Sequence, residues 1–531
     1  MTTRLITIKK TSRFFPEIIA SMRYFFCLSC RRDSASGACL LLLLSLCLLP
    51  LMPTAESLWI DEFYTVGYAA QPTLAAWFEH LRNDVLVVHA SDAQMPLGMF
   101  LPWLWAGFLG VSELALRVPN LVYAAAAMVA LACIGRHMRL GRLPLLFAIQ
   151  PFVWFYVNEA RPYALHMAAG AWLLYGLLSG LRQRGTGVAW AWALSVSGFV
   201  LAASTITGVV PFAVASIMLV CGLVRLRALP SRAACCVLGG AWLLLLPFGA
   251  FFLWSIVHGV GNRGLWRAGL SNLFFAAYEF AGYSGLGIPR NTLRAMLAGH
   301  DMVQLRGLLT PHLPAMALLT LVYGALAVES HAAWRFSTHW RRVTLLTAAT
   351  WLVASAVLVW FASLVTNVPI FGRHLAALVP VWVVAIGVLT AGLQQARPRW
   401  GALVTGALAL ILLSSAAIQR FDPKYGHDDY RGAATQALAT ARQGQTVWWV
   451  ADYNAGDYYG IVHPGVHMFS NLDSIHKLPL VLPGLALISK AELFDVHGVV
   501  RQRLMAEGYH RKYFSVAFEQ WTPPALSTAK P

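Results

Sequence analysis

The chain has 531 residues, of which 58% are hydrophobic and only 12% are charged, whereas a soluble domain carries about 25% charged residues. So few charged residues cannot cover the surfaces of several soluble domains, and the hydrophobic content excludes a disordered chain. The formal charge of +17 fits either nucleic acid or an anionic membrane surface, and the positions of the charges decide between them.

Long stretches without Asp, Glu, Lys or Arg recur along the sequence, and about 20 apolar residues span a bilayer. The candidates are residues 38–54, 96–111, 119–135, 144–158, 162–180, 188–206, 207–224, 233–255, 311–328, 343–362, 375–393 and 400–418. Short loops rich in Lys and Arg stay in the cytoplasm, and five loops of that kind share one side only if one early candidate does not span. The run 96–111 is short and contains Pro96 and Pro102, so we interpret it as an interfacial helix on the outer face.

Eleven spans then place the N-terminus inside and the C-terminus outside. This topology gives a cytoplasmic basic arm at 1–37, a transmembrane domain at 38–418 with outer loops 55–118 and 256–310, and an outer C-terminal domain at 419–531. The inner side holds 20 Lys and Arg against three acidic residues, so it accounts for the whole net charge of +17. The charge is therefore an orientation signal and does not favour nucleic acid. A signal-peptide core is the alternative reading of the first run.

The first outer loop opens with two adjacent acids, Asp61 and Glu62, among aromatic residues. Such a pair suits a general base or a metal ligand, and the alternative is the solvated start of a helix. His89, Asp92 and Gln94 follow before Pro96. There Asp92 would cap the turn if the loop has no further role, and His89 would be an ordinary loop residue.

A short turn between two expected spans contains Glu159, Arg161 and Tyr163. An acid and an arginine so close to the hydrocarbon edge indicate either a functional site or interface anchoring with a weak surface ion pair. None of the eleven spans contains Asp, Glu, Lys or Arg. Ion-coupled transporters usually need such residues at membrane depth, so the pattern argues against transport.

Two later outer segments carry arginines. The loop 256–310 contains Arg290 and Arg294 among glycines and tyrosines, a composition that suits close approach to a polar ligand, although an ordinary surface loop is the alternative. No strand–loop–helix context surrounds it, which excludes a P-loop or a dinucleotide fingerprint. Arg373 and His374 lie at the outer end of a span, where an arginine can hold a lipid phosphate or simply snorkel.

The C-terminal segment 419–531 predicts a small α/β domain. Residues 429–442 and 495–507 have helical character, whereas 446–451 and 512–518 are expected to be strands. We expect this domain to recognise an acceptor or to cap the site.

Several short segments form a pattern in chain order. They are Asp61-Glu62, Gln94-Met95-Pro96-Leu97, Leu116-Arg117-Val118-Pro119, Glu159-Ala160-Arg161-Pro162-Tyr163-Ala164-Leu165, Arg373-His374 and Asp429-Tyr430-Arg431-Gly432-Ala433. Together they resemble the GT-C superfamily of membrane glycosyltransferases, in particular the bacterial members related to protein O-mannosyltransferases and lipid A aminoarabinose transferases. The resemblance implies an all-α polytopic membrane protein of the bacterial inner membrane. Such a protein would have about 11 transmembrane helices, interfacial helices and a small C-terminal α/β extracytoplasmic domain in the periplasm.

The resemblance also implies a reaction. A polyprenyl-phosphate sugar would be the donor, and a hydroxyl of a lipid, glycan or protein would be the acceptor, with no role for nucleic acid. Asp61 is our candidate general base, with Glu62 and Glu159 as further catalytic residues. The candidates for binding substrate and leaving phosphate are Arg161, Tyr163, His89, Gln94, Arg290, Arg294, Arg373 and His374.

A divalent metal ion is a candidate cofactor, with Glu62 and Glu159 as its ligands. Gln94 stands where relatives place His or Glu, and a glutamine is a weaker metal ligand, so metal dependence is open. Two other functions stay as alternatives, a lipid-linked-sugar flippase and a glycan polymerase or ligase. A strict need for Asp61 would separate sugar transfer by general base catalysis from both.

Overall fold

The computed structural model describes residues 35–260, 268–290, 292–293, 302–366, 368, 370–426, 428–515 and 518–524. The chain divides into two compact units. The helical unit comprises the residues up to Met52, Leu121–Val157 and Tyr163–Gln419, and the sheet unit comprises Pro53–Asn120, Asn158–Pro162 and Arg420–Pro531. Arg294 lies outside the described residues.

The helical unit consists of apolar helices joined by short turns. Its elements are α2 (Ala35–Leu48), η1 (Leu49–Leu51), α7 (Pro119–Met138), α8 (Leu143–Ala148), α9 (Pro151–Val157), α10 (Tyr163–Arg182), α11 (Ala189–Ser204), η4 (Ile206–Gly208), α12 (Val209–Arg225), α13 (Arg232–Val257), α14 (Leu270–Ala281), η5 (Tyr283–Gly285), α16 (Met302–Leu309), η6 (Thr310–His312), α17 (Leu313–Val328), α18 (Ser330–Phe336), α19 (His339–Thr366), η7 (Gly372–Leu378), α20 (Val379–Ala396) and α21 (Pro398–Phe421). Within the described residues, eight helices are long and apolar enough to cross a membrane, and three shorter apolar helices accompany them. The predicted all-α polytopic architecture is therefore confirmed.

One expected span differs from the prediction. The run 144–158 forms two short helices, α8 and α9, separated by Ile149 and Gln150. Pro151 begins the second helix, because it has no N–H to continue the first one and its fixed φ suits a first helical position. The interpretation of 144–158 as one continuous span was thus wrong.

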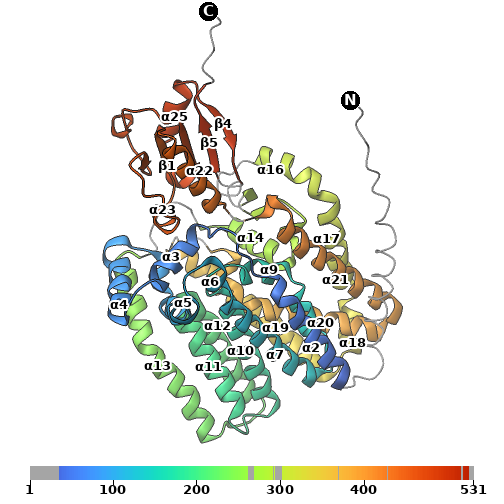
Figure 1. The fold of residues 1–531 in the computed structure, drawn as a ribbon. Helices are drawn as coiled ribbons and strands as arrows, with labels where there is room; N and C mark the ends of the chain where they lie inside the picture. The colour runs from blue at the N-terminus through green and yellow to red at the C-terminus, as the bar shows by residue number, and fades with distance from the viewer. Residues whose placement is uncertain are drawn as a thin grey trace, which may run out of the picture. The chain divides into compact units, whose positions relative to one another are not determined.

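Small residues let the central helices of this unit approach closely. Helix α10 is buried along almost its whole length and lies beside α11 and α12 (Figure 1). A Cβ at Gly176 would come within 2.6 Å of the Leu194 backbone nitrogen, and one at Gly180 within 2.8 Å of the Trp190 ring. Glycine at such positions allows the backbone contact that holds helices together in lipid.

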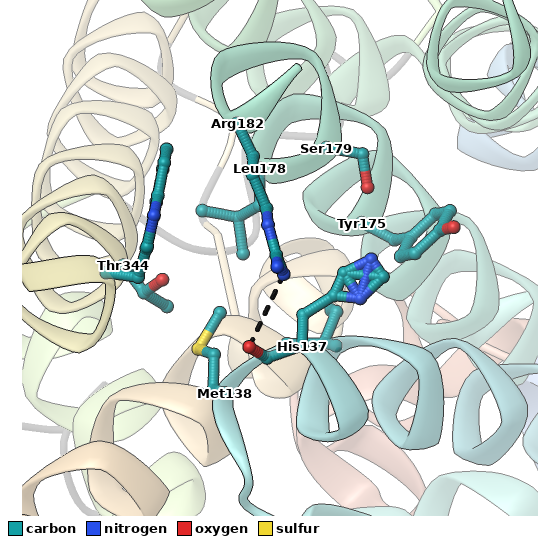
Figure 2. A pocket seen from close by; sticks show the side chains of 9 residues that line it. His137, Met138, Tyr175, Leu178, Ser179, Arg182 and Thr344 are labelled. Atoms are coloured by element: carbon teal, nitrogen blue, oxygen red, sulfur yellow. Dashed lines mark hydrogen bonds between the residues drawn. The ribbon is translucent and has the colours of Figure 1, made fainter. Parts of the chain in front are cut away.

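A small cavity lies among α7, α10 and α19 (Figure 2). Its lining includes His137, Tyr175, Arg182 and Thr344. Arg182 Nη1 lies 3.4 Å from the backbone oxygen of His137, to which it donates. None of the predicted site residues lines this cavity.

The sheet unit combines the first outer loop with the C-terminal segment. Its elements are α3 (Ile60–Ala69), α4 (Leu74–Asn83), the π-helical turn η2 (Asp84–Val88), η3 (Ser91–Gln94), α5 (Pro96–Leu109), α6 (Glu113–Arg117), η8 (Pro423–Tyr425), α22 (Tyr430–Arg442), β1 (Val447–Val450), α23 (Tyr453–Tyr458), β2 (Val466–Met468), η9 (Ile475–Lys477), β3 (Leu485–Ser489), α24 (Ala491–Phe494), α25 (Val499–Ala506), β4 (His510–Tyr513) and β5 (Phe518–Thr522). The predicted interfacial segment 96–111 is the helix α5, and no membrane plane tests its orientation.

The five strands form one mixed sheet in the order β2-β1-β3-β5-β4. Alternate residues of β1 point to opposite faces, as the period of a strand requires. Val447 and Trp449 pack with the alanines of α22 on one face. Trp448 and Val450 pack with residues of α25 on the other face. The predicted C-terminal α/β domain is confirmed.

The end of this domain differs from the expectation. The run 512–518 was predicted to be one strand, but β4 ends at Tyr513 and β5 begins at Phe518. The two strands pair antiparallel, with Tyr513 opposite Glu519. A hairpin therefore replaces the expected strand, because the chain reverses between Tyr513 and Phe518 and each half pairs with the other.

Candidate functional site

A buried ion pair brings three of the sequence segments together in the sheet unit. Arg117 donates from Nε to Glu62 Oε1 at 3.0 Å and from Nη2 to Oε2 at 2.7 Å, and both residues are fully buried. The amide of Ala160 donates to the same carboxylate at 2.6 Å, and that of Trp59 donates at 3.0 Å. A bidentate arginine–carboxylate pair of this kind is strong and directional.

The remaining donors of Arg117 are also used. Nη1 donates to the backbone oxygens of Thr54 at 2.9 Å and Glu56 at 2.7 Å, and Nη2 donates to that of Ser57 at 3.2 Å. The guanidinium thus binds the chain that leads from the first span to α3. The sequence segment containing Arg117 was noticed, but its role was missed because its partner lies 55 residues away.

Asp61 and Glu62 are neighbours in sequence and differ in accessibility. Glu62 points inward and is 0% exposed, whereas Asp61 is half-buried in the first turn of α3. Successive residues of a helix point about 100° apart, which separates the two carboxylates. The start of a helix also favours negative charge. Of the two acids, Asp61 is the one that a bound molecule can reach.

Arg161 holds the same turn from another direction. Its Nη1 donates to the backbone oxygen of Asp61 at 2.9 Å, and its Nη2 contacts Asp92 Oδ1 in a buried ion pair. Asp92 accordingly does not cap a helix, and no side-chain cap is present at η3 or α5. Because its guanidinium is engaged by Asp92, Arg161 is placed to position Asp61, and a phosphate would compete for it.

Glu159 precedes this arginine in a tight turn. Its side chain is fully buried, and its backbone oxygen accepts from Asn120 Nδ2 at 2.5 Å and from the Arg161 amide at 2.7 Å. The neighbouring Asn158 accepts from the Thr54 amide at 2.7 Å. These contacts fix the turn between the two expected spans.

His89 and Gln94 flank the buried Asp92. His89 has a left-handed backbone, with φ of 55°, at the end of η2, and its side chain is exposed. Gln94 ends η3 and is half-buried. Both stay predictions as substrate-binding residues.

The C-terminal segment reaches the same turn within this unit. Tyr430 is fully buried and packs edge-on against Phe63 of α3, with ring centroids 5.3 Å apart. Arg431 donates from its amide to Ser57 Oγ at 3.0 Å and from Nη2 to the Ala55 oxygen at 2.5 Å. Asp429 caps α22 by accepting from the Gly432 amide at 2.8 Å. Tyr430 and Arg431 therefore join the C-terminal domain to the loop that carries Asp61.

Burial also shifts the protonation of an acid close to Asp61. Burial raises the pKa of Asp452, the N-cap of α23, and the nearby Asp61 carboxylate adds to that rise. Two carboxylates in one region repel each other when both are ionised. The site in the sheet unit is therefore rich in acids.

The helical unit holds a second polar cluster. Arg290 Nε lies 2.8 Å from Glu279 Oε1, and its Nη2 donates to the Tyr156 hydroxyl at 2.6 Å. That hydroxyl donates to Glu279 Oε1 at 3.1 Å, and the guanidinium lies 4.4 Å from the centre of the Phe155 ring. Tyr163 is buried and packs edge-on against Tyr156 at 5.1 Å. Glu279 was not among the predicted site residues, although it lies in the same predicted outer loop, 256–310, as its partner Arg290.

Arg373 and His374 begin η7, next to this cluster. His374 Nδ1 accepts from the Phe371 amide at 2.9 Å, so the histidine caps η7. Both side chains are half-buried. A Cβ on Gly372 would collide with Glu279 Oε2, so a larger residue there would force that carboxylate to shift.

The predicted metal site does not fit these contacts well. Both oxygens of Glu62 already accept hydrogen bonds from Arg117 and from backbone amides. In the part of the chain that the structure describes, no group of three or more His, Cys, Asp or Glu side chains is placed to hold a metal ion. We therefore derive no step that uses a metal.

Comparisons with known proteins give structural likeness only. No protein-family model matches the chain, and no curated protein matches it. It is similar to the crystal structure of ArnT from Cupriavidus metallidurans bound to undecaprenyl phosphate, with a TM-score of 0.47, 12% identity, and coverage of 94% of this chain and 100% of that chain. It is also similar to arabinofuranosyltransferase AftD from Mycobacteria, with a TM-score of 0.44, 12% identity, and coverage of 93% and 40%. A likeness at these scores does not assign a function to the chain.

Proposed function

We propose that the chain is a membrane glycosyltransferase of the GT-C type, which moves a sugar from a polyprenyl-phosphate donor to a hydroxyl of a lipid or glycan. The observation that carries the proposal is the convergence of Asp61-Glu62, Arg117 and Glu159-Ala160-Arg161 on one turn of the sheet unit. These segments are distant in sequence and are the ones that resemble this superfamily. Their contacts leave Asp61 as the accessible acid.

In the proposed reaction Asp61 is the general base. It accepts the proton of the acceptor hydroxyl, whose oxygen forms a bond to the anomeric carbon of the donor. The bond from that carbon to the phosphate oxygen breaks, and the polyprenyl phosphate leaves with the electron pair, so the configuration inverts. A phosphate is a weak base, and no general acid is needed for its departure.

The other residues act by position and charge. Glu62 and Arg117 hold the start of α3, and Arg161 holds the Asp61 backbone. Arg290 and Arg373, which lie in the helical unit, stay sequence-based candidates for binding a phosphate, since charge-assisted bonds stabilise an anion. The same chemistry would serve a protein hydroxyl as acceptor, and the donor sugar would be a hexose or a pentose.

We test the proposal in cells. Mass spectrometry of envelope glycans and lipid A is compared between a strain lacking the gene and strains carrying wild type, Asp61→Asn or Asp457→Asn. Asp457 is an exposed acid of the same unit, so its variant is the matched control. We expect the missing modification to return with wild type and with Asp457→Asn, and to fall at least about 100-fold with Asp61→Asn. Full restoration by Asp61→Asn would exclude Asp61 as the base and favour a flippase or a ligase.

The proposed location is the inner membrane, with the site facing the periplasm. The orientation follows from the distribution of Lys and Arg alone. A reporter fused after Glu113 tests it, because that residue lies in the proposed outer segment. A cytoplasmic signal from this fusion would contradict the topology and the side on which transfer occurs.

A further inference from the structure

Lys490 is an unusual lysine in the sheet unit. It follows β3 and has a left-handed backbone with φ of 37° and ψ of 70°. Its side chain is 5% exposed. A residue other than glycine seldom adopts this conformation, and lysine is rarely buried unless it is paired. Such strain persists only where the surrounding contacts enforce it, and it is found most often at functional sites.

Two contacts hold the ammonium group. Its Nζ lies 2.5 Å from Asp428 Oδ2, whose side chain is 1% exposed. It also lies 5.1 Å from the centre of the Trp59 ring, a distance at which a cation is attracted to an aromatic face. The preceding residue, Ser489, shares a 3.0 Å hydrogen bond with the Tyr430 hydroxyl. Residues at the end of β3 therefore contact both Tyr430, at the start of α22, and Trp59, the residue before α3.

Trp59 connects this pair to Asp61. It is the N-cap of α3, its amide donates to Glu62 Oε2 at 3.0 Å, and its backbone oxygen accepts from the Glu62 amide at 2.8 Å. The main chain of Trp59 is thus fixed by Glu62, and its ring is fixed by Lys490. Asp61 lies between the anchored residues Trp59 and Glu62, in the first turn of α3.

Several acidic side chains lie near the ring of Tyr430, and one of them pairs with Lys490. Burial raises the pKa of Tyr430, and the carboxylates of Asp428, Asp452 and Asp61 contribute to that rise. Three acids therefore lie around one buried ring. Like charges in one region disfavour the ionised state, and a buried cation paired with one of them, as Lys490 is with Asp428, offsets part of that repulsion.

We propose that Lys490 is a positioning residue for the transfer reaction: paired with Asp428 and seated on Trp59, it sets the first turn of α3, so that the C-terminal sheet forms part of the working site. The proposal rests on the proposed function. It deepens that function, because it assigns the C-terminal domain a task in the reaction itself in addition to contacts with an acceptor.

The test uses the full-length protein in lipid nanodiscs. The key variant is the double change Asp428→Asn with Lys490→Met, which removes both charges and leaves no unpaired buried ion, a situation that is often tolerated. Lys490→Arg keeps the charge, and Lys512→Met, at an exposed position of β4, is the matched control. Release of undecaprenyl phosphate is measured with undecaprenyl-phosphate mannose and undecaprenyl-phosphate arabinose as donors and an envelope lipid extract as acceptor.

We expect the double variant to keep the melting temperature of wild type and to lose at least about tenfold in kcat, since misplacement of a catalytic group affects turnover strongly. KM for the donor should change less than about threefold, because the donor contacts are untouched. Lys490→Arg should recover most of the loss, and Lys512→Met should match wild type. A double variant with wild-type kcat would overturn the proposal.

Hydrogen exchange keeps this test independent of the proposed function. In the double variant we expect faster exchange of the amides at 59–62 and unchanged exchange in β1 and β3. Unchanged exchange at 59–62 would overturn the positioning role even if no donor is turned over. Loss of protection throughout the sheet would also overturn it, because the pair would then serve only the stability of the domain. Absence of turnover by wild type, with the expected exchange pattern, would contradict the proposed function alone.

Discussion

Each unit of the molecule contains a buried glutamate–arginine pair, and the two pairs have different surroundings. Both oxygens of Glu62 accept two hydrogen bonds, from Arg117 and from backbone amides. In the helical unit, Glu279 Oε1 contacts Arg290 and Tyr156, whereas Oε2 is buried and accepts no hydrogen bond from the described residues. The Glu62 carboxylate is thus fully hydrogen-bonded, whereas the Glu279 carboxylate can accept a further hydrogen bond.

This difference indicates two kinds of role. A fully satisfied buried pair fixes a single geometry, and breaking it is costly. An unsatisfied buried acceptor already costs free energy, which a donor from a ligand or a moving side chain would recover. We therefore expect the Glu62–Arg117 pair to fix the geometry of the Asp61 turn, and the Glu279–Arg290 pair to be the one that can rearrange.

The largest predicted effect comes from breaking the Glu62–Arg117 pair. Glu62→Gln leaves Arg117 buried without its counter-ion, so we expect a loss of about 3 to 5 kcal/mol in the free energy of unfolding. Thermal unfolding of the purified protein in detergent measures it. The matched control is Glu79→Gln in the exposed Arg82–Glu79 pair, where the change should be under about 1 kcal/mol. Equal effects at the two positions would contradict the assignment.

A smaller loss of stability is predicted for Glu279→Gln. The aromatic rings around Arg290 stabilise its charge, and one oxygen of the carboxylate makes no hydrogen bond with the described residues that could be lost. We therefore expect a loss of about 1 to 2 kcal/mol in the free energy of unfolding. If this pair rearranges with substrate, the same variant raises KM for the donor. A loss of stability as large as that of Glu62→Gln, with unchanged kinetics, would remove the distinction between the two pairs.

Gly372→Ala tests the packing beside the same carboxylate. The added Cβ would collide with Glu279 Oε2, and we expect a loss of about 1 kcal/mol as the side chains shift. The double variant Gly372→Ala with Glu279→Ala should be less destabilised than the sum of the two single changes, because the second change removes the obstacle. Strictly additive effects in thermal unfolding would show that the two residues do not interact.

The smallest predicted effect is that of chelation. Glu62 has no oxygen to spare for a metal, so dialysis against EDTA is expected to change the initial rate of transfer less than about twofold. Readdition of Mg²⁺ or Mn²⁺ is the control. A rate that vanishes with EDTA and returns with Mn²⁺ would restore the metal hypothesis and require ligands other than Glu62.

Much of the fold could be predicted, because the membrane spans are encoded in local hydropathy. The prediction failed where a charge-free run contained a break: residues 144–158 include Gln150 and Pro151, which end one helix and start another. The run 512–518 failed for a related reason, because a strand pattern does not show where a hairpin reverses. In both cases the composition was read correctly and the backbone turn was missed.

The candidate site was predictable in its segments and not in its pairings. Asp61 and Glu62 are adjacent, and only the direction in which the helix faces shows that one is buried in an ion pair and the other is accessible. A helix cap was one of the readings left open for Asp92, but the residue pairs with Arg161, 69 residues away. Lys490 gave no signal at all, since its partners come from distant parts of the sequence. Contacts over such separations depend on the tertiary fold, and one sequence does not reveal them.

The most direct test of the account is a transfer assay with purified protein. Wild type, Asp61→Asn and Asp457→Asn are incubated with undecaprenyl-phosphate mannose or arabinose and an envelope lipid extract, and mass spectrometry and NMR follow the released undecaprenyl phosphate and the anomeric configuration of the product. We expect release of the phosphate together with an inverted glycoside for wild type and for Asp457→Asn, and almost none for Asp61→Asn. Transfer by Asp61→Asn at the wild-type rate, or a product with retained configuration, would contradict it.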